Sequence, residues 1–137
     1  MKKLFLLLVL SFTFNACSIE DDGPNIYYEV LPIDSFIVPD HFNYLGTHEI
    51  KLYYKKPTNC HNYGGIFFEK NLNERIIAVQ SIVNIRNDCQ PYEGDLIEVT
   101  FDFEVVNSQP YIFKFFKGKD DEGNFMYDVI EIPVFGN

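Results

Sequence analysis

The residues of this chain that most resemble a chemical site are Cys60 and His61, in the stretch PTNCHNYGG at residues 57–65. A thiol beside an imidazole could be a nucleophile with its base, part of a metal site, or a disulfide half-cystine next to an unrelated histidine. Adjacent side chains of an extended chain point to opposite faces, which disfavours the nucleophile. Zinc needs four ligands, and Cys60, His61 and Cys89 would supply three at most, with His41 or His48 as a possible fourth. The choice depends on the other cysteines and on the elements that position them.

The first 16 residues have the pattern of a secretory signal peptide. Two lysines follow Met1, residues 4–14 are almost entirely apolar, and the small Ala16 precedes Cys17. A basic start, a short apolar run and a small residue before the cut are typical of such a peptide. The run is shorter than the roughly 20 residues that a membrane-spanning helix needs. We therefore predict export, with residues 1–16 removed.

The sequence FNAC at residues 14–17 resembles a bacterial lipobox, fitting it at Ala16 and Cys17 and departing from it at Phe14 and Asn15. The resemblance implies an outer-membrane lipoprotein in which Cys17 carries the lipid, and this lipid is the only expected link to a membrane. An ordinary signal peptide with a coincidental cysteine is the alternative.

Residues 17–26 are small, acidic and broken by Gly-Pro, which predicts a flexible tether. The acidic cluster at residues 20–22 resembles the signal that sends Bacteroidetes lipoproteins to the cell surface. A merely solvated linker is the alternative to this signal. Periplasmic and surface orientations both stay open.

Without residues 1–16, which hold two lysines and no acids, 9 basic and 20 acidic side chains remain, a net charge of −11. Such a surface repels phosphate backbones, so nucleic acid is not an expected partner. The three cysteines are an odd number for an exported protein. If Cys17 is acylated, Cys60 and Cys89 remain, and an oxidising compartment favours a disulfide between them.

Alternating apolar and polar residues predict strands along almost the whole remaining chain, and aromatic residues, 17% of the sequence, favour strands as well. Residues 96–106 alternate most clearly, whereas residues 75–85 are apolar on both faces and predict a strand covered on both sides. Two prolines make residues 27–39 a kinked edge strand. The other predicted strands are residues 48–56, 64–70, 111–117 and 125–134.

Seven short strands without helical periodicity predict one domain at residues 27–137, an all-β, antiparallel two-sheet sandwich of immunoglobulin type. A small barrel is the alternative. Tyr111 begins the sixth strand two residues before Phe113, as in the tyrosine corner of immunoglobulin-like domains; a plain core tyrosine would give the same pattern. Together these segments resemble small uncharacterised Bacteroidetes lipoproteins of the Flavobacteria type with a predicted immunoglobulin-like domain. The resemblance implies a fold and a location, and it brings no catalytic, metal or cofactor residues.

The stretch KDDEGN at residues 119–124 is acidic. Its residues 120–124 could offer oxygen ligands to calcium. An EF-hand places its acids at alternating positions, whereas these are consecutive, and a polar hairpin is the alternative interpretation. Side chains outside the predicted core, or beside the predicted disulfide, could form a contact surface. These candidates are His61, Tyr63, Tyr92, Tyr53 and Phe116.

The sequence therefore predicts a lipid-anchored, disulfide-linked domain that acts as a non-catalytic binding module for a protein or a glycan. A structural envelope component that assembles through an edge strand is the alternative. No catalytic residue, metal ligand or cofactor is assigned.

Overall fold

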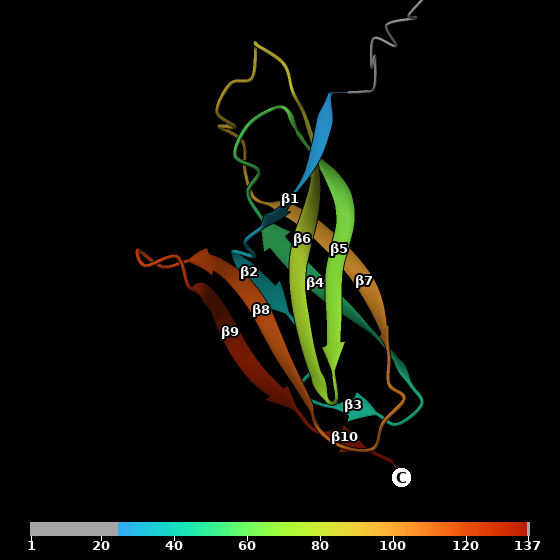
Figure 1. Ribbon diagram of the computed structural model, residues 1–137. Coiled ribbons are helices and arrows are strands. Elements are labelled where there is room, and N and C mark those ends of the chain that lie inside the picture. The colour runs from blue at the N-terminus through green and yellow to red at the C-terminus, as the bar shows by residue number, and fades with distance from the viewer. Residues whose placement is uncertain (1–24, 137) are drawn as a thin grey trace, which may run out of the picture.

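The computed structural model describes residues 25–136, which form strands and connecting loops without a helix. The strands form a sandwich-like arrangement that is compatible with an immunoglobulin-like fold and confirms the all-β prediction (Figure 1). No described segment is a helix that could cross a membrane. The strands are β1 Ile26–Leu31, β2 Ser35–Ile37, β3 Phe42–Asn43, β4 Thr47–Tyr54, β5 His61–Asn71, β6 Glu74–Asn84, β7 Ile97–Glu104, β8 Tyr111–Lys119, β9 Phe125–Ile132 and β10 Val134–Phe135.

The larger sheet has five strands, with β6 pairing to three of the others. β5 pairs along one edge of β6. On the opposite edge, β8 pairs with the first half of β6 and β1 with the second half, and β9 continues from β8. The smaller sheet has the order β2-β4-β7 and lies behind β5 and β6 in Figure 1, whereas β3 and β10 form a separate short pair.

The structure divides the strand predicted at residues 27–39 into two strands in different sheets. β1 pairs with β6, and after Pro32 the chain crosses over so that β2 pairs with β4. Proline has no N–H to donate to a ladder, so it suits the point where pairing changes. The N–H of Ile33 donates to the carbonyl of Phe116, which fixes the crossover against β8.

Two pairings, β6 with β8 and β3 with β10, are parallel. The sequence prediction was wholly antiparallel, and it gave seven strands because β2, β3 and β10 did not stand out as separate elements. Residue alternation reports the face on which a side chain lies, and it contains no information about the direction of the neighbouring strand.

The core lies between the two sheets and is rich in aromatic rings. From β6, Ile77 and Val79 are fully buried, and from β4, Ile50 and Leu52 are fully buried opposite them. Each such side chain contributes about 1.5–3 kcal/mol relative to an exposed position. Phe103, Tyr111, Phe113 and Phe42 pack together, with ring centroids 5.0–6.4 Å apart.

Tyr111 has the hydrogen bonds expected of a tyrosine corner. Its ring is fully buried, and its Oη accepts the backbone N–H groups of Val106 at 3.1 Å and Asn107 at 2.9 Å. A tyrosine at the start of such a strand that bonds to the backbone just upstream is the feature seen in immunoglobulin-like domains. The hydroxyl therefore fixes the turn between β7 and β8 to the core.

Candidate functional site

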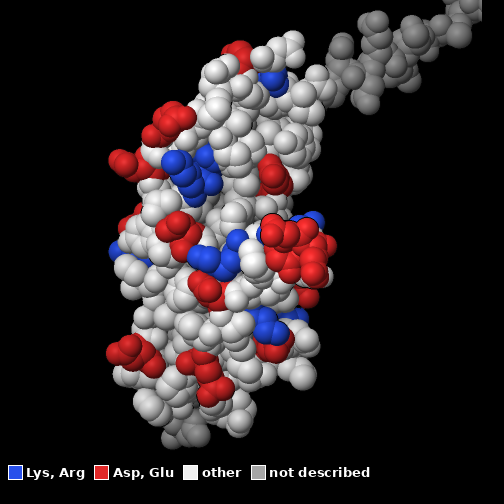
Figure 2. All heavy atoms as spheres, turned by 90° about the vertical axis from the view of Figure 1, so that its left-hand side faces the viewer, with Lys and Arg blue, Asp and Glu red and all other residues white. Residues whose placement is uncertain are grey.

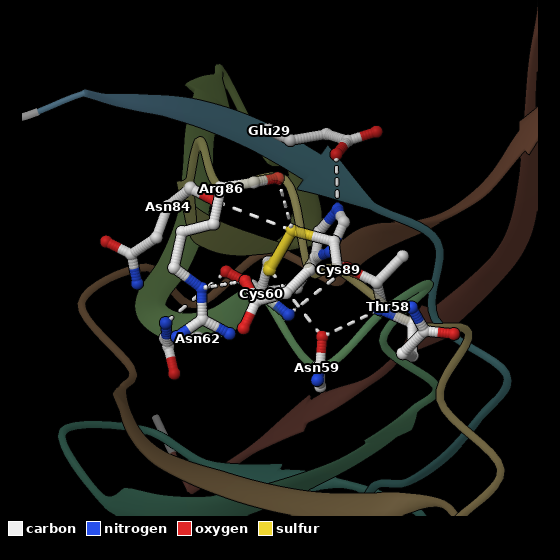
Figure 3. Close-up of a disulfide and its surroundings, with 11 residues drawn as sticks. Glu29, Thr58, Asn59, Cys60, Asn62, Asn84, Arg86 and Cys89 are labelled. Atoms are coloured by element: carbon white, nitrogen blue, oxygen red, sulfur yellow. Dashed lines mark hydrogen bonds and ion pairs between the residues drawn. A yellow bond between two sulfur atoms is a disulfide. The ribbon is translucent and has the colours of Figure 1, made fainter.

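Cys60 and Cys89 form a disulfide with their Cα atoms 5.5 Å apart, which confirms the predicted pairing (Figure 3). The bond joins the loop after β4 to the loop after β6 at one end of the sandwich. Backbone bonds reinforce this junction: Asn59 N–H donates to Gln90 O, and Tyr92 N–H donates to Pro57 O. Because both sulfurs are bonded, Cys60 has no thiolate to act as a nucleophile or a metal ligand.

His61 lies directly beside the disulfide, and its imidazole is buried. Nε2 lies 2.8 Å from Oε2 of Glu29, to which it donates because a carboxylate only accepts (Figure 3). Nδ1 lies 2.8 Å from Oγ1 of Thr58, which also accepts the N–H of Cys60 at 3.2 Å. Both ring nitrogens are therefore satisfied inside the protein.

A carboxylate, an imidazole and a hydroxyl in a row are the groups of a hydrolytic triad. Such a triad acts on a substrate held beside the hydroxyl, in a pocket with oxyanion donors. Neither of the two grooves considered below is lined by Thr58 or His61. The row connects β1, β5 and the disulfide loop.

The structure corrects two members of the predicted contact surface. His61 is 6% exposed because Glu29 and Thr58 cover it, and Phe116 is 9% exposed because Phe125 and Tyr127 pack on it. Both side chains are therefore largely buried, although Phe116 keeps a small accessible area that lines a groove on the outer face of its sheet.

Of the other three predicted contact residues, Tyr63 and Tyr92 lie at the disulfide end, whereas Tyr53 lies elsewhere. Tyr63 is exposed near the disulfide end, and Tyr92 lies there as well, with Lys56 Nζ 4.7 Å from its ring. Burial raises the pKa of the nearby Tyr54, and the hydroxyls of Tyr63 and Tyr92 raise it further. Tyr53 lies on the smaller sheet, where its Oη donates to Glu98. The predicted surface is therefore distributed over separate faces.

Residues 120–124 form the tip of the β8–β9 hairpin. The carboxylate of Asp120 accepts bonds from the N–H groups of Glu122 and Asn124 and from the Asn124 amide. Its hydrogen bonds, led by that from the Asn124 side chain, lower the pKa of Asp120 below its ordinary value. Gly123 adopts a φ of 88°, as a tight turn requires. Among residues 25–136, no cluster of three or more His, Cys, Asp or Glu side chains is placed to hold a metal ion.

A mostly apolar groove of about 540 Å³ lies on the outer face of the five-stranded sheet, and we call it the outer-face groove. Ile76, Ala78 and Phe116 form its floor. Val30 and Phe67 line it from β1 and β5, and Phe125 and Tyr127 line it from β9. Its charged lining residues are Glu69, Lys119 and Glu29, of which Glu29 has its carboxylate bonded to His61. A mostly apolar concavity with few polar groups is the usual form of a binding site.

Strand alternation explains why these side chains face outward. Phe67 pairs with Ala78 and therefore lies on the face opposite the core-facing Phe68 and Ile77. A register shift between Phe116 and Gly118, where Gly118 has a φ of 105°, marks a bulge beside the groove. The strand predicted at residues 75–85 to be covered on both sides has Ile76 and Ala78 on its second face, where they line the outer-face groove.

The exposed apolar residues of this face extend beyond the groove. Phe125 is 60% exposed, and Tyr28 and Val129 are also exposed on outward positions of β1 and β9. On the β9 side of the molecule, acidic side chains occur along the whole length, with basic ones among them (Figure 2). Sequence reasoning did not select Val30, Phe67 or Phe125. The adjacent Phe67 and Phe68 were the sequence signal that could have indicated an apolar outer face, because one of two neighbouring strand residues must face away from the core.

The predicted lipid-bearing Cys17 and most of the tether lie outside the described residues, and β1 begins at Ile26. No protein-family model, no curated protein and no solved structure matches this chain.

Proposed function

We propose that this protein is a lipid-anchored, non-catalytic binding module of the cell envelope, and that it holds a partner protein in the outer-face groove. The observation that carries the proposal is the groove itself, with Phe67, Phe125 and Tyr127 around an apolar floor. The signal-peptide and lipobox patterns at residues 1–17 support the location.

A protein partner is favoured over a small ligand by the surroundings of the groove. Apolar side chains continue outward to Tyr28 and Val129, so a ligand confined to the groove would leave this face uncovered. Contiguous exposed apolar surface of this kind marks protein interaction sites, and aromatic residues are enriched there. The groove then receives an apolar anchor side chain of the partner, as the central pockets of interfaces do.

The acidic balance defines the partner further. Glu69 and Lys119 supply opposite charges to the lining of the groove, and Glu29, whose carboxylate bonds to His61, lines it as well. This chain has 9 basic and 20 acidic residues after residue 16. We therefore expect a partner whose surface is neutral or basic around its apolar anchor. Steering between opposite charges raises the association rate, and it weakens as salt is added.

Site-specific photo-crosslinking in the cells that produce the protein tests this function. Phe125 is replaced by p-benzoylphenylalanine, and Leu72, an apolar residue that is 89% exposed in the β5–β6 turn, serves as the matched control. We expect one discrete protein adduct from position 125 and none from position 72. Equal labelling from both positions, or an adduct from neither, contradicts a partner protein in the groove. Retention on a glycan array without an adduct points to a glycan instead.

The second candidate is a structural component that assembles through a sheet edge. It rests on one observation: within residues 25–136, β7 pairs only with β4, so its other edge is unpaired over eight residues. Such an edge is a template for another strand. Sedimentation equilibrium of the full chain over about a hundredfold range of concentration tests it, because self-assembly follows mass action. A constant monomer mass contradicts assembly between copies.

A further inference from the structure

A second groove, separate from the outer-face groove, lies where the edges of the two sheets approach each other. It measures about 330 Å³ and is lined on one side by Ile66 and Phe68 of β5 and on the other by Phe101 and Phe103 of β7. The Phe68 ring centroid lies 6.4 Å from that of Phe101 and 6.3 Å from that of Phe103. Figure 1 shows β5 and β7 on the same side of the sandwich. The groove therefore opens directly onto the apolar interior.

Arg75 lines this groove and is the most unusual buried residue of the protein. It occupies an inward position of β6, opposite Lys70 of β5 and beside Phe113 of β8, and it is only 4% exposed. Its Nη1 donates to the carbonyl oxygens of Leu72 at 2.8 Å and Glu74 at 2.7 Å. The guanidinium carbon lies 4.9 Å from the centroid of the Tyr111 ring. These contacts hold the side chain in place.

No carboxylate of the described residues pairs with this buried cation. The nearest acid in sequence, Glu74, is taken by Lys114, whose Nζ lies 2.8 Å from its Oε2. The Nε of Arg75 is buried and has no hydrogen-bond partner in the described part of the chain. Burying a charge without a counter-ion is expensive, and the ring of Tyr111 and two carbonyls compensate for it only in part.

We propose that this groove binds a small carboxylic acid with a single apolar tail, and that Arg75 holds its carboxylate. The carboxylate would supply the missing counter-ion and accept bonds from the guanidinium, whose fork of donors matches its geometry. The aromatic walls would take the tail. At about 330 Å³ the groove is at the small end of ligand sites, which fits a short chain or a single ring.

The charged residues around the groove restrict the ligand further. Asp102 and Glu104 of β7 line it together with Lys70 of β5. A second acidic group on the ligand would meet these two carboxylates, whereas an apolar tail would not. The site therefore selects monocarboxylates over dicarboxylates, independently of what the outer-face groove binds.

The sequence contains no tryptophan, so Phe101→Trp in the full chain gives a single fluorescent reporter on the groove wall. Titration uses octanoate as the probe, and octan-1-ol as its neutral counterpart. We expect saturable changes with octanoate, at an affinity at least about tenfold above that of octanol, as a charge-assisted bond implies. Arg75→Met should abolish this difference. Arg86→Met, at an exposed arginine paired with Asp88, should leave it unchanged.

Equal affinities for octanoate and octanol, or no response to octanoate, would overturn the assignment. If Arg75→Met does not fold, ¹⁵N NMR of the arginine Nε–H groups in the Phe101→Trp chain decides the question. A shift of the Arg75 resonance with octanoate but not with octanol supports the site. An unchanged resonance under saturating octanoate refutes it.

Discussion

The Nε2 atom of His61 lies 2.8 Å from the Oε2 atom of Glu29, and this bond connects the two strands that flank β6 near its end. The ring is 6% exposed, and its other nitrogen contacts Thr58. The arrangement gives the histidine after Cys60 a structural role, because its imidazole connects the disulfide loop to β1.

Replacing Glu29 tests the structural role of this bond. Glu29→Leu removes the acceptor and leaves the buried Nε2 unpaired, so we expect a loss of about 1–3 kcal/mol in the free energy of unfolding. Glu29→Gln keeps an acceptor oxygen of the same reach and should cost less than about 1 kcal/mol. Urea unfolding of the two variants measures both values. Equal losses would show that the hydrogen bond contributes nothing measurable.

Removing the disulfide should have a larger effect. The Cys60→Ser, Cys89→Ser double variant releases a loop with a sequence separation of 29 residues. The loop-entropy relation gives a loss of about 3.5 kcal/mol in unfolding free energy. Urea unfolding of the unmodified chain with and without a reductant provides the matched comparison. A loss below about 1 kcal/mol in both experiments would mean that the two loops are held by their backbone bonds alone.

Tyr111→Phe isolates the tyrosine corner, because it removes only the hydroxyl from a fully buried ring. Two backbone N–H groups then lose their acceptor, which predicts a destabilisation of about 1–3 kcal/mol. Tyr53→Phe is the control, since Tyr53 bonds to Glu98 at a solvent-accessible position and this variant should lose clearly less stability. Thermal unfolding of both variants measures the difference. Similar losses would argue against a special role of the corner.

The pairing of Cys60 with Cys89 and most strand positions could be predicted from the sequence, because both depend on local or countable features. Two cysteines remained once Cys17 was assigned elsewhere, and alternation at residues 96–106 fixed which side chains of β7 face the core. The tyrosine corner could also be predicted from the sequence, since the pattern needs only Tyr111 at the start of a strand.

The grooves could not be predicted, because they depend on which strands become neighbours. Phe67 and Phe125 are 58 positions apart, and only the order β5-β6-β8-β9 brings them to one face. Arg75 is the first residue of the strand predicted at residues 75–85, and the sequence analysis did not select it. Its burial follows from the parallel pairing of β6 with β8, which places Phe113 beside it, and residue alternation contains no sign of that pairing.

The acidic hairpin should show a distinct titration. Hydrogen bonds to its charged form lower the pKa of Asp120, so its contribution to hairpin stability is present above the ordinary pKa of an aspartate. That contribution is lost as the pH falls through the lowered value. An NMR titration of the Asp120 carboxyl carbon measures this pKa, and Asn124→Ala, which removes the leading bond, should raise it toward the ordinary value. An unaltered pKa in the variant would contradict this cause.

The most direct test of the binding function combines the crosslinker at position 125 with a charge inside the groove. Val30→Arg places a cation on the groove wall at a side chain that is 42% exposed, and Ile37→Arg is the matched control, 55% exposed on β2 of the other sheet. We expect Val30→Arg to reduce the yield of the protein adduct at least about tenfold, as loss of an interface anchor does. Ile37→Arg should leave the yield unchanged, with both variants unfolding at the temperature of the parent. An undiminished adduct in a folded Val30→Arg chain would contradict the assignment of the outer-face groove as the binding site.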